Sequence, residues 1–569
     1  MSYILGVSGY FHDSSVCLLR DGQLIEFVKE ESLTRIKGTR GFPSRSLNFL
    51  IRKYNLTDNN IDYLAFYEKP LRGWATNIHF SLAKPKVSFD LLRHQIKQFW
   101  TGPIHFVSEL KKTIRISEHK LLFVPHHLSH ALSALAFVDP ELQQKPLLNF
   151  VFDGVGDGKT TSIFEIRNTE AKLVFQQDYP HSLGLFYSAV TDYCGFLVNE
   201  GEYKLMALAA FGSPKYYDFF KENIFSINAP NFTLDMSWFD YDKSPARSYS
   251  DKWVKRFGSP IHEKEINEFN SEGFSRAADL ACSSQLILEE VINATIIWGI
   301  EKTGIRDLTI SGGVAQNSVA MCSAGEVNEV DSLTIPPSPG DSGAAIGAAN
   351  FAKMLMDHRG ISCREIYFGD SQIDTEKPIF SELFAFEDGP SKMNKHFDAL
   401  INSGEIISCY FGGNEIGPRA LCNRSLICAA NNRKSVLNLN SIVKKREKFR
   451  PLAPVMLRSV AEKWFNVNPK VSDCYRWMAI TAVASEELPV EYEPILHFDR
   501  TARLQIIDDE KHPIYAFLSR NKGKTDMLVN TSFNVAGDPI VFDEFDCFVN
   551  MQRLGITYML TDTGLYSVK

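Results

Sequence analysis

The sequence lacks the features of several common protein classes. Its ten cysteines include no CxxC pair, which argues against a structural zinc site and against a disulfide framework. No apolar run reaches the about 18 residues that span a bilayer, and the first residues, MSYILGVSGY, resemble no signal peptide. Cations are in deficit, with 61 Lys and Arg against 68 Asp and Glu, whereas nucleic-acid-binding domains are usually basic. We expect a cytoplasmic protein that neither inserts into membranes nor binds nucleic acid.

The chain has the composition of a globular protein. Of its 569 residues, 44% are hydrophobic and 23% charged, and at about 150 residues per domain this length predicts two to four domains. A strand–turn–strand pattern occurs twice, and the later segments read as helices and strands of an α/β chain. The expected strands are 3–9, 15–20, 23–30, 61–67, 121–124, 146–153, 161–166, 308–311 and 405–411, and the expected helices are 44–54, 275–303 and 341–356. The polar stretch after Met356 predicts a domain junction there.

Two histidines and two aspartates form a candidate metal site. His126 and His130 are four residues apart, so on a helix both imidazoles lie on one face. Asp153 ends an apolar strand, and Asp341 opens a predicted helix. Two nitrogen and two oxygen ligands would suit Fe(II), Mn or Zn. Core or capping histidines, and a helix N-cap at Asp341, are the alternative interpretation.

Three further features are candidate sites with ordinary structural alternatives. The loop from Gly312 and Gly313 to Asn317 follows a strand, so its amides could cradle a nucleotide, although glycine pairs are common in turns. Lys204 would by default be a surface lysine. His12, in the loop of the first hairpin, is either a general base or a side chain that stabilises the turn.

Cations gather in the C-terminal half of this acidic chain. The segment from Lys444 to Arg450 contains five cations in seven residues, and Arg450 stands between Phe449 and Pro451. Guanidinium groups in an apolar setting favour an anionic ligand such as phosphate or pyrophosphate, although most charge runs are solvated surfaces. Other candidates in this half are Arg419, Arg424, Arg446, Arg503, Asn530 and Ser532.

Taken together, these motifs resemble one family over nearly the whole chain. The segments FHDSSVCLLRDGQLIEFVKEESLTR, HHLSHALSA, FDGVGDG, KLMALAAFG, SGGVAQN, PPSPGDSGAAIGAA, EIGPRALCNRSL, VKKREKFRPLAPVML and NTSFNVAGDPIV are similar to those of the O-carbamoyltransferase family of NodU, CmcH and TobZ, in family order. The chain departs from the family at Gln316 and, after Lys204, at Ala207, Ala210 and Phe211.

The resemblance implies an α/β protein with two domains. Residues 1–356 would form a duplicated actin-like/sugar-kinase-type (ASKHA) domain with the metal site, and residues 357–569 a YrdC-like domain. The family converts ATP, with Mg²⁺, and carbamoyl phosphate to carbamoyl adenylate and pyrophosphate in the C-terminal domain. The N-terminal domain then transfers the carbamoyl group to a hydroxyl of a small-molecule or sugar acceptor, as in natural-product, toxin or glycan biosynthesis. A homodimer is left open.

The resemblance also assigns roles to residues. The iron ligands would be His126, His130, Asp153 and Asp341, with another divalent metal left open, and His12 would serve the acceptor. Lys444 and Arg450 would be catalytic, and the residues that bind the substrates would be Arg419, Arg424, Arg446, Arg503, Asn530 and Ser532. The further candidates for nucleotide binding, from the sequence pattern, are Lys204, Gly312, Gly313 and Asn317. Two alternatives remain: a tRNA threonylcarbamoyl-type transferase and a non-catalytic nucleotide-binding protein.

Overall fold

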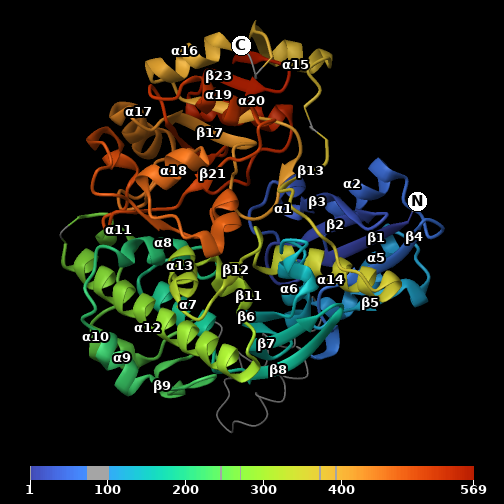
Figure 1. Ribbon diagram of the computed structural model, residues 1–569, viewed down its shortest axis with the longest axis vertical. Helices are drawn as coiled ribbons and strands as arrows, with labels where there is room; N and C mark the ends of the chain where they lie inside the picture. The colour runs from blue at the N-terminus through green and yellow to red at the C-terminus, as the bar shows by residue number, and fades with distance from the viewer. Residues whose placement is uncertain (1, 73–101, 244–246, 270, 371–372, 391–393) are drawn as a thin grey trace. The chain divides into compact units, whose positions relative to one another are not determined.

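The chain folds into two compact units (Figure 1). The computed structural model describes residues 2–72, 102–243, 247–269, 271–370, 373–390 and 394–569. Unit 1 comprises residues 1–24 and 39–364, and unit 2 comprises residues 25–38 and 365–569. A short N-terminal segment therefore belongs to the unit that contains the C-terminus. The division of function at residues 356 and 357 stays a prediction.

Unit 1 repeats one arrangement of strands. In its first sheet, β1 (Tyr3–Ser8) pairs antiparallel with β2 (Ser15–Arg20) and parallel with β4 (Ile61–Phe66), which pairs parallel with β5 (Leu121–Phe123). The second sheet repeats these relations, with β6 central and the order β12-β11-β6-β7-β8. Its strands are β6 (Leu147–Gly156), β7 (Lys159–Arg167), β8 (Glu170–Asp178), β11 (Asp307–Ser311) and β12 (Ser332–Thr334). The duplication expected of the N-terminal domain is therefore present.

Two helices pack together between these sheets of unit 1. Helix α14 (Asp341–Asp357) packs on β1, β2 and β4, whereas α6 (His126–Leu135) packs on β6, β7 and β11. The helices also pack against each other, and Figure 1 shows them between the two sets of strands. Small residues make this possible: a Cβ on Gly347 of α14 would lie 1.7 Å from the backbone oxygen of Ser129 in α6. The alanine- and glycine-rich sequence of α14 therefore brings its first turn close to the first turn of α6.

This close approach makes Gly347 sensitive to a single added methyl group. We expect Gly347→Ala to lower the free energy of unfolding by about 3 kcal/mol, because the backbones of α6 and α14 would have to separate. Gly360→Ala is the matched control, since a Cβ there meets its nearest atom at 3.4 Å. Urea denaturation of both full-length variants measures the effect, and equal stabilities would contradict this view of the helix contact.

The remaining helices of unit 1 include one long core helix. Helix α12 (Glu272–Thr303) is long and apolar enough to cross a membrane, but 61% of its most apolar window is buried inside the protein. The sequence places Leu286 on its apolar stripe, and this is wrong, since Leu286 is 39% exposed. The other helices are α2 (Ser44–Tyr54), α5 (Phe106–Thr113), α7 (Leu183–Tyr193), α8 (Glu202–Ala209), α9 (Tyr217–Asn223), α10 (Asp251–Phe257), α11 (Glu263–Ile266) and α13 (Ser318–Glu326), and a separate hairpin joins β9 (Phe225–Asn228) to β10 (Asn231–Leu234).

Unit 2 is built on an eight-stranded mixed sheet of order β14-β24-β23-β15-β17-β22-β18-β21. These strands are β14 (Phe384–Asp388), β15 (Ile407–Tyr410), β17 (Arg424–Ala429), β18 (Ala453–Met456), β21 (Gln505–Ile506), β22 (Met527–Ser532), β23 (Tyr558–Thr561) and β24 (Leu565–Val568). The helices are α1 (Glu30–Thr34), α15 (Pro378–Leu383), α16 (Lys395–Ser403), α17 (Arg433–Asn438), α18 (Arg458–Trp464), α19 (Pro513–Arg520) and α20 (Glu544–Leu554). The predicted α/β class, with two units, is confirmed.

Candidate metal site and cation cluster

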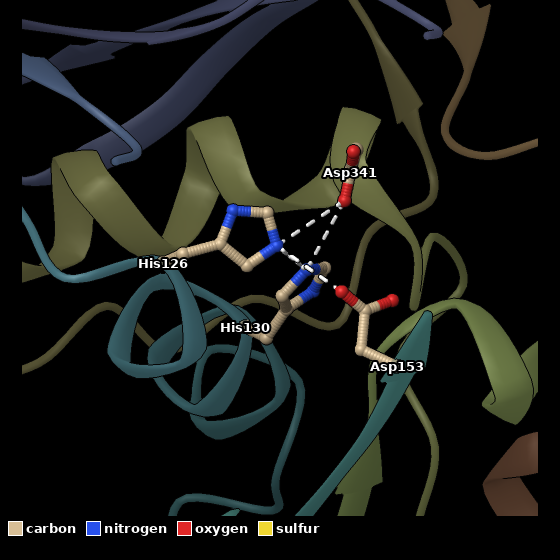
Figure 2. A group of neighbouring side chains, drawn as sticks. All are labelled: His126, His130, Asp153 and Asp341. Atoms are coloured by element: carbon tan, nitrogen blue, oxygen red, sulfur yellow. Dashed lines mark hydrogen bonds and ion pairs between the residues drawn. The ribbon is translucent and has the colours of Figure 1, made fainter. Parts of the chain in front are cut away.

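Four side chains from three elements of unit 1 converge on one point, the His–Asp cluster of His126, His130, Asp153 and Asp341 (Figure 2). The histidines come from the first turns of α6, Asp153 from β6, and Asp341 from the first turn of α14. One ligand atom from each lies within 4.8 Å of the others, and all four residues are buried. The spacing of these residues in the sequence does not show that they converge, and the structure does.

The distances in the cluster suit a shared ion. Nε2 of His126 lies 3.0 Å from Nε2 of His130 and 3.3 Å from Oδ2 of Asp153. Oδ1 of Asp341 lies 3.2 Å from Nε2 of His130 and 3.6 Å from Nε2 of His126. Two ligand atoms about 2.1 Å from one ion are about 3.0 Å apart at a right angle and about 3.4 Å apart at a tetrahedral angle. The donor atoms therefore fit a divalent metal.

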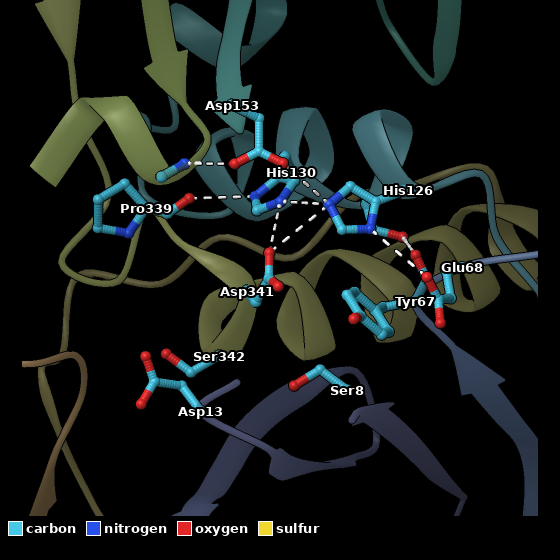
Figure 3. A network of polar contacts seen from close by, with 12 residues as sticks. Ser8, Asp13, Tyr67, Glu68, His126, His130, Asp153, Pro339, Asp341 and Ser342 are labelled. Atoms are coloured by element: carbon cyan, nitrogen blue, oxygen red, sulfur yellow. Dashed lines mark hydrogen bonds and ion pairs between the residues drawn. The ribbon is translucent and has the colours of Figure 1, made fainter. Parts of the chain in front are cut away.

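Backbone groups around the cluster fix the orientation of its members (Figure 3). Nδ1 of His130 lies 3.1 Å from the carbonyl oxygen of Pro339, so a proton on Nδ1 leaves Nε2 as a lone-pair donor. The N–H of Gly313 donates to Oδ1 of Asp153 at 2.9 Å. Such outer contacts are what orient the ligands of metal sites.

Two buried polar atoms of the cluster have no hydrogen-bond partner among the described residues: Nδ1 of His126 and Oδ2 of Asp341. Glu68 approaches the first of these, with Oε2 at 4.0 Å from Nδ1 of His126. A Cβ on Gly156 would lie 2.0 Å from Cδ2 of His126, so glycine makes room for this imidazole. Burial without full hydrogen bonding is costly, and a cation at the cluster would offset part of that cost.

The electrostatics of the cluster also favour positive charge. Burial alone would lower the pKa of His126. The hydrogen bond to Asp153 and the charge of Asp341 outweigh burial and raise this pKa to about 10. Burial raises the pKa of Asp153, yet the hydrogen bond to His126 and the charge of His130 bring it well below its usual range. The neighbouring His127 differs: burial lowers its pKa to about 3, and its Nδ1 pairs with Oγ of Ser162 on β7. His127 is therefore a neutral core histidine.

His12 lies in a loop with an uncommon backbone. The flanking residues Tyr10 and Asp13 have φ angles of 76° and 54°, which non-glycine residues seldom adopt. Nδ1 of His12 lies 3.1 Å from Oδ2 of Asp13, and its side chain is 21% exposed. Burial lowers the pKa of His12, but the hydrogen bond with Asp13 and the charges of Asp341, Asp13 and Asp153 raise it to about 9. The charge of the His–Asp cluster thus affects the pKa of this partly exposed imidazole.

The glycine loop lies against the His–Asp cluster, and its role as a nucleotide cradle stays a prediction. The N–H of Gly312 donates to the carbonyl oxygen of Pro339, and that of Gly313 to Asp153, so both amides build the His–Asp cluster. The Asn317 side chain caps α13 and bonds with Gln285. Lys204 forms an ion pair with Glu263 at 2.6 Å. These contacts do not bring Lys204 and Asn317 to the cluster, and their role with a nucleotide stays a prediction.

In unit 2, five of the predicted cations influence one another: Lys444, Arg446, Arg450, Arg419 and Arg503, the cation cluster. Burial, followed by Arg446, Arg450 and Lys37, lowers the pKa of Lys444 to about 6. Burial, followed by Arg419 and Arg450, lowers the pKa of Arg503 well below its usual range. Arg450 contributes to the lowered pKa of both Lys444 and Arg503, and it also pairs with Glu447 at 3.2 Å. Repulsion among partly buried cations is what a polyanion would relieve.

Lys444 and Arg446 are tied to the strand β22 and the residues after it. A π-helical turn, Leu439–Val443, ends directly before Lys444, and such turns are frequent at functional sites. Nζ of Lys444 donates to the Ser532 oxygen at 2.8 Å and to both oxygens of Asn534. Nη2 of Arg446 donates to Oγ1 of Thr531, and the Ser532 hydroxyl donates to Asn534. The predicted NTSFN segment thus lies against the predicted cations.

Arg424 and Asn530 form hydrogen bonds with other residues of unit 2. Arg424 is buried, lies over the ring of Tyr410, and donates to the backbone oxygens of Phe411, Asn423 and Gly412. These contacts do not bring its guanidinium to the other arginines, and its role in binding an anion stays a prediction. Nδ2 of Asn530 donates to the Ala420 oxygen and to Oε1 of Gln505, both at 2.7 Å.

Comparisons with known proteins agree with this layout. The family description "Carbamoyltransferase N-terminus" matches residues 3–350, and "Carbamoyltransferase C-terminus" matches residues 398–567. "Uncharacterized protein sll1178" of Synechocystis sp. is 31% identical, covering 99% of this chain and 96% of its own length. "Nodulation protein NolNO" of Sinorhizobium fredii is 28% identical over 98% and 79%, and "Nodulation protein U" of Rhizobium tropici is 32% identical over 41% and 39%.

Proposed function

The chain belongs to the carbamoyltransferase family and is a carbamoyltransferase enzyme, and from that premise we propose that it is an ATP-dependent O-carbamoyltransferase. Unit 2 would form carbamoyl adenylate, and unit 1 would transfer the carbamoyl group to a hydroxyl of a small molecule or sugar in the cytoplasm. The observation that supports this proposal is the convergence of His126, His130, Asp153 and Asp341 in unit 1. These side chains could bind a metal, and they belong to a different unit from the cation cluster.

The first reaction joins carbamate to AMP. Water releases phosphate from carbamoyl phosphate, a carbamate oxygen forms a bond to the α-phosphorus of ATP, and the bond from that phosphorus to pyrophosphate breaks. Negative charge accumulates on the leaving pyrophosphate, and preorganised cations stabilise it. We assign that stabilisation to Lys444, Arg446 and Arg450, and the mutual repulsion of the cation cluster supports binding of a polyanion.

The second reaction moves the carbamoyl group to the acceptor. The acceptor oxygen bonds to the carbamoyl carbon, the bond from that carbon to AMP breaks, and the hydroxyl proton goes to a base. His12 is the candidate base, because it is partly exposed and Asp13 orients its Nδ1. A metal bound at the His–Asp cluster would offset the charges of Asp341 and Asp153 that raise the pKa of His12, and so would favour the neutral imidazole that a base requires. Its neighbour Phe11 is 44% exposed and contacts the His12 ring at 4.7 Å between centroids, which offers an apolar surface beside the base.

The His–Asp cluster would hold the metal of this second reaction, and we propose Fe²⁺. When bound, a divalent metal neutralises phosphate charge and assists departure of the leaving group. The chain's own part is to keep both Nε2 atoms directed at one point, through Pro339 and the backbone around α6, and to keep Asp153 in place through Gly313.

Exchange of labelled pyrophosphate into ATP tests the first reaction. We expect exchange that depends on carbamoyl phosphate, because formation of the adenylate is reversible. Mass spectrometry then tests the second reaction, as the gain of one carbamoyl unit on members of a panel of hydroxyl compounds such as amino sugars and oligosaccharides. Absence of exchange in a folded, metal-loaded protein would contradict the proposal.

A further inference from the structure

An open, polar cavity of about 310 Å³ lies in unit 2, outside the cation cluster. We propose that this cavity binds a small phosphorylated sugar or polyol, whose phosphate is held by Arg433 and Lys524. The proposal goes beyond the proposed function, because neither of the two reactions uses these residues. The residues that line the cavity are Asn402, Ala429, Asn431, Asn432, Arg433, Lys524 and Thr525.

The cavity lies at the opposite end of β17 and β22 from the residue that bonds with Lys444. The two strands pair so that Ser425 lies opposite Ser532 and Ala429 lies opposite Leu528. Ala429 lines the cavity, whereas the Ser532 oxygen accepts from Lys444. Each strand residue advances about 3.3 Å, so these two ends of the sheet are about 13 Å apart. A ligand of the cavity would therefore be separate from an anion bound at the cation cluster.

Hydrogen bonds fix the polar wall of the cavity. Thr525 is only 2% exposed, and its hydroxyl donates to Oδ1 of Asn402 at 2.9 Å. Nδ2 of Asn402 donates in turn to the Asp398 oxygen at 2.7 Å. Nδ2 of Asn431 donates to the backbone oxygen of Lys524 at 2.9 Å, which ties the loop after β17 to the turn before β22. A wall that is held in this way lowers the cost of ordering a ligand.

Two cations border this wall without a counterion. Arg433 and Lys524 are exposed, and in the part of the chain that the structure describes neither side chain forms an ion pair or a hydrogen bond. Of the neighbouring carboxylates, Asp398 pairs with Arg520 at 2.8 Å, and Asp526 accepts from a backbone N–H at 2.6 Å. A guanidinium fork and an ammonium group on one cavity form a pair suited to a phosphate group.

The size and the lining of the cavity indicate a ligand larger than a phosphate ion. At about 30 Å³ for each water molecule, the cavity has room for about ten waters, most of which a phosphate ion would leave in place. Among the described residues, Ala429 is the one apolar residue of the lining, and three of the others carry amides: Asn402, Asn431 and Asn432. Amides both donate and accept hydrogen bonds, as hydroxyl groups do. A sugar or polyol phosphate matches this combination.

Acetylation of lysines in the full-length protein, measured by peptide mass spectrometry, tests the site with glucose 6-phosphate as the probe. Increasing probe should slow acetylation of Lys524 along a saturation curve, to about a tenth of its initial rate at about ten times the dissociation constant. Lys522 is the internal control, because it is exposed in the same turn and does not line the cavity. Its rate should not change.

Two variants test whether Arg433 shares the phosphate with Lys524. In Arg433→Met, we expect glucose 6-phosphate to protect Lys524 about tenfold less well, because one of the two cations is missing. Lys434→Met is the matched control, since Lys434 is the neighbouring exposed cation and does not line the cavity. This variant should keep the protection of the parent.

The outcomes decide this proposal without reference to catalysis. An unchanged rate at Lys524 with millimolar glucose 6-phosphate would overturn it, and so would equal protection of Lys522 or full protection in Arg433→Met. Equal protection by inorganic phosphate at the same concentration would overturn the assigned class of ligand, because the sugar would then contribute nothing. A protein that protects Lys524 but shows no pyrophosphate exchange would retain this site and lose the proposed function.

Discussion

Replacing His130 by alanine is expected to abolish carbamoyl transfer while the exchange of pyrophosphate into ATP continues. His130 contributes Nε2 to the His–Asp cluster and lies in unit 1, whereas the cation cluster lies in unit 2. Without this imidazole the site loses one of its four ligand groups. The buried carboxylates of Asp153 and Asp341 also lose a neighbouring side chain that stabilises their negative charge. We expect carbamoyl transfer to fall about a thousandfold, with exchange within about twofold of the parent.

The matched control for this experiment is His127→Ala, on the same helix. His127 is also buried, but its Nδ1 pairs with Ser162, and it is not part of the cluster. Elemental analysis of the purified proteins should find metal in the parent and in His127→Ala, and little in His130→Ala. Loss of exchange together with transfer in a folded His130→Ala protein would contradict the division of labour, and so would retention of metal and of transfer.

The His–Asp cluster is predictable from the sequence because each ligand has a local signal. The spacing of His126 and His130 places both rings on one face of α6, and Asp153 and Asp341 stand at the end of an apolar strand and the start of a helix. Glu68 gives no such signal: it lies close to His126 only because the residues after β4 lie beside the first turn of α6. Asp157, which accepts from the His126 N–H at 3.0 Å, had a usable signal, since it follows Asp153 in the segment FDGVGDG.

The cation cluster was harder to predict, because a run of basic residues in the sequence does not show which way each side chain points. Arg424 and Arg450 are both predicted to bind an anion, yet the Arg424 side chain turns back onto backbone oxygens where β15 ends and β17 begins. The place of residues 25–38 in unit 2 was missed for another reason. These residues precede the C-terminal domain by more than three hundred residues, and only tertiary contacts such as Arg35 with Asp546 assign them to unit 2.

Replacing Lys444 by methionine is expected to abolish the pyrophosphate exchange itself. The amine bonds with the oxygens of Ser532 and Asn534 and is influenced by Arg446 and Arg450. Its loss removes a group that would be protonated when a polyanion binds, and it releases the segment after β22. We expect exchange to fall by about a hundredfold to a thousandfold. Lys448→Met, which removes an exposed lysine from the same segment, should leave exchange close to the parent. Equal activity of the two variants would exclude Lys444 from the reaction.

Lys444→Met and Lys448→Met also test how the stability of the protein depends on pH. The pKa of Lys444 is about 6 in the folded protein, lowered by burial and then by Arg446, Arg450 and Lys37, whereas an unfolded lysine titrates near about 10.4. Between these values the unfolded chain binds more protons, so this lysine makes folding less favourable as the pH falls from about 10 to 6. The parent and Lys448→Met should therefore gain up to about 1.4 kcal/mol of unfolding free energy per pH unit from pH 7 to 9 relative to Lys444→Met. Urea denaturation at pH 7, 8 and 9 measures this slope, and parallel curves for all three proteins would mean that the folded Lys444 keeps an ordinary pKa.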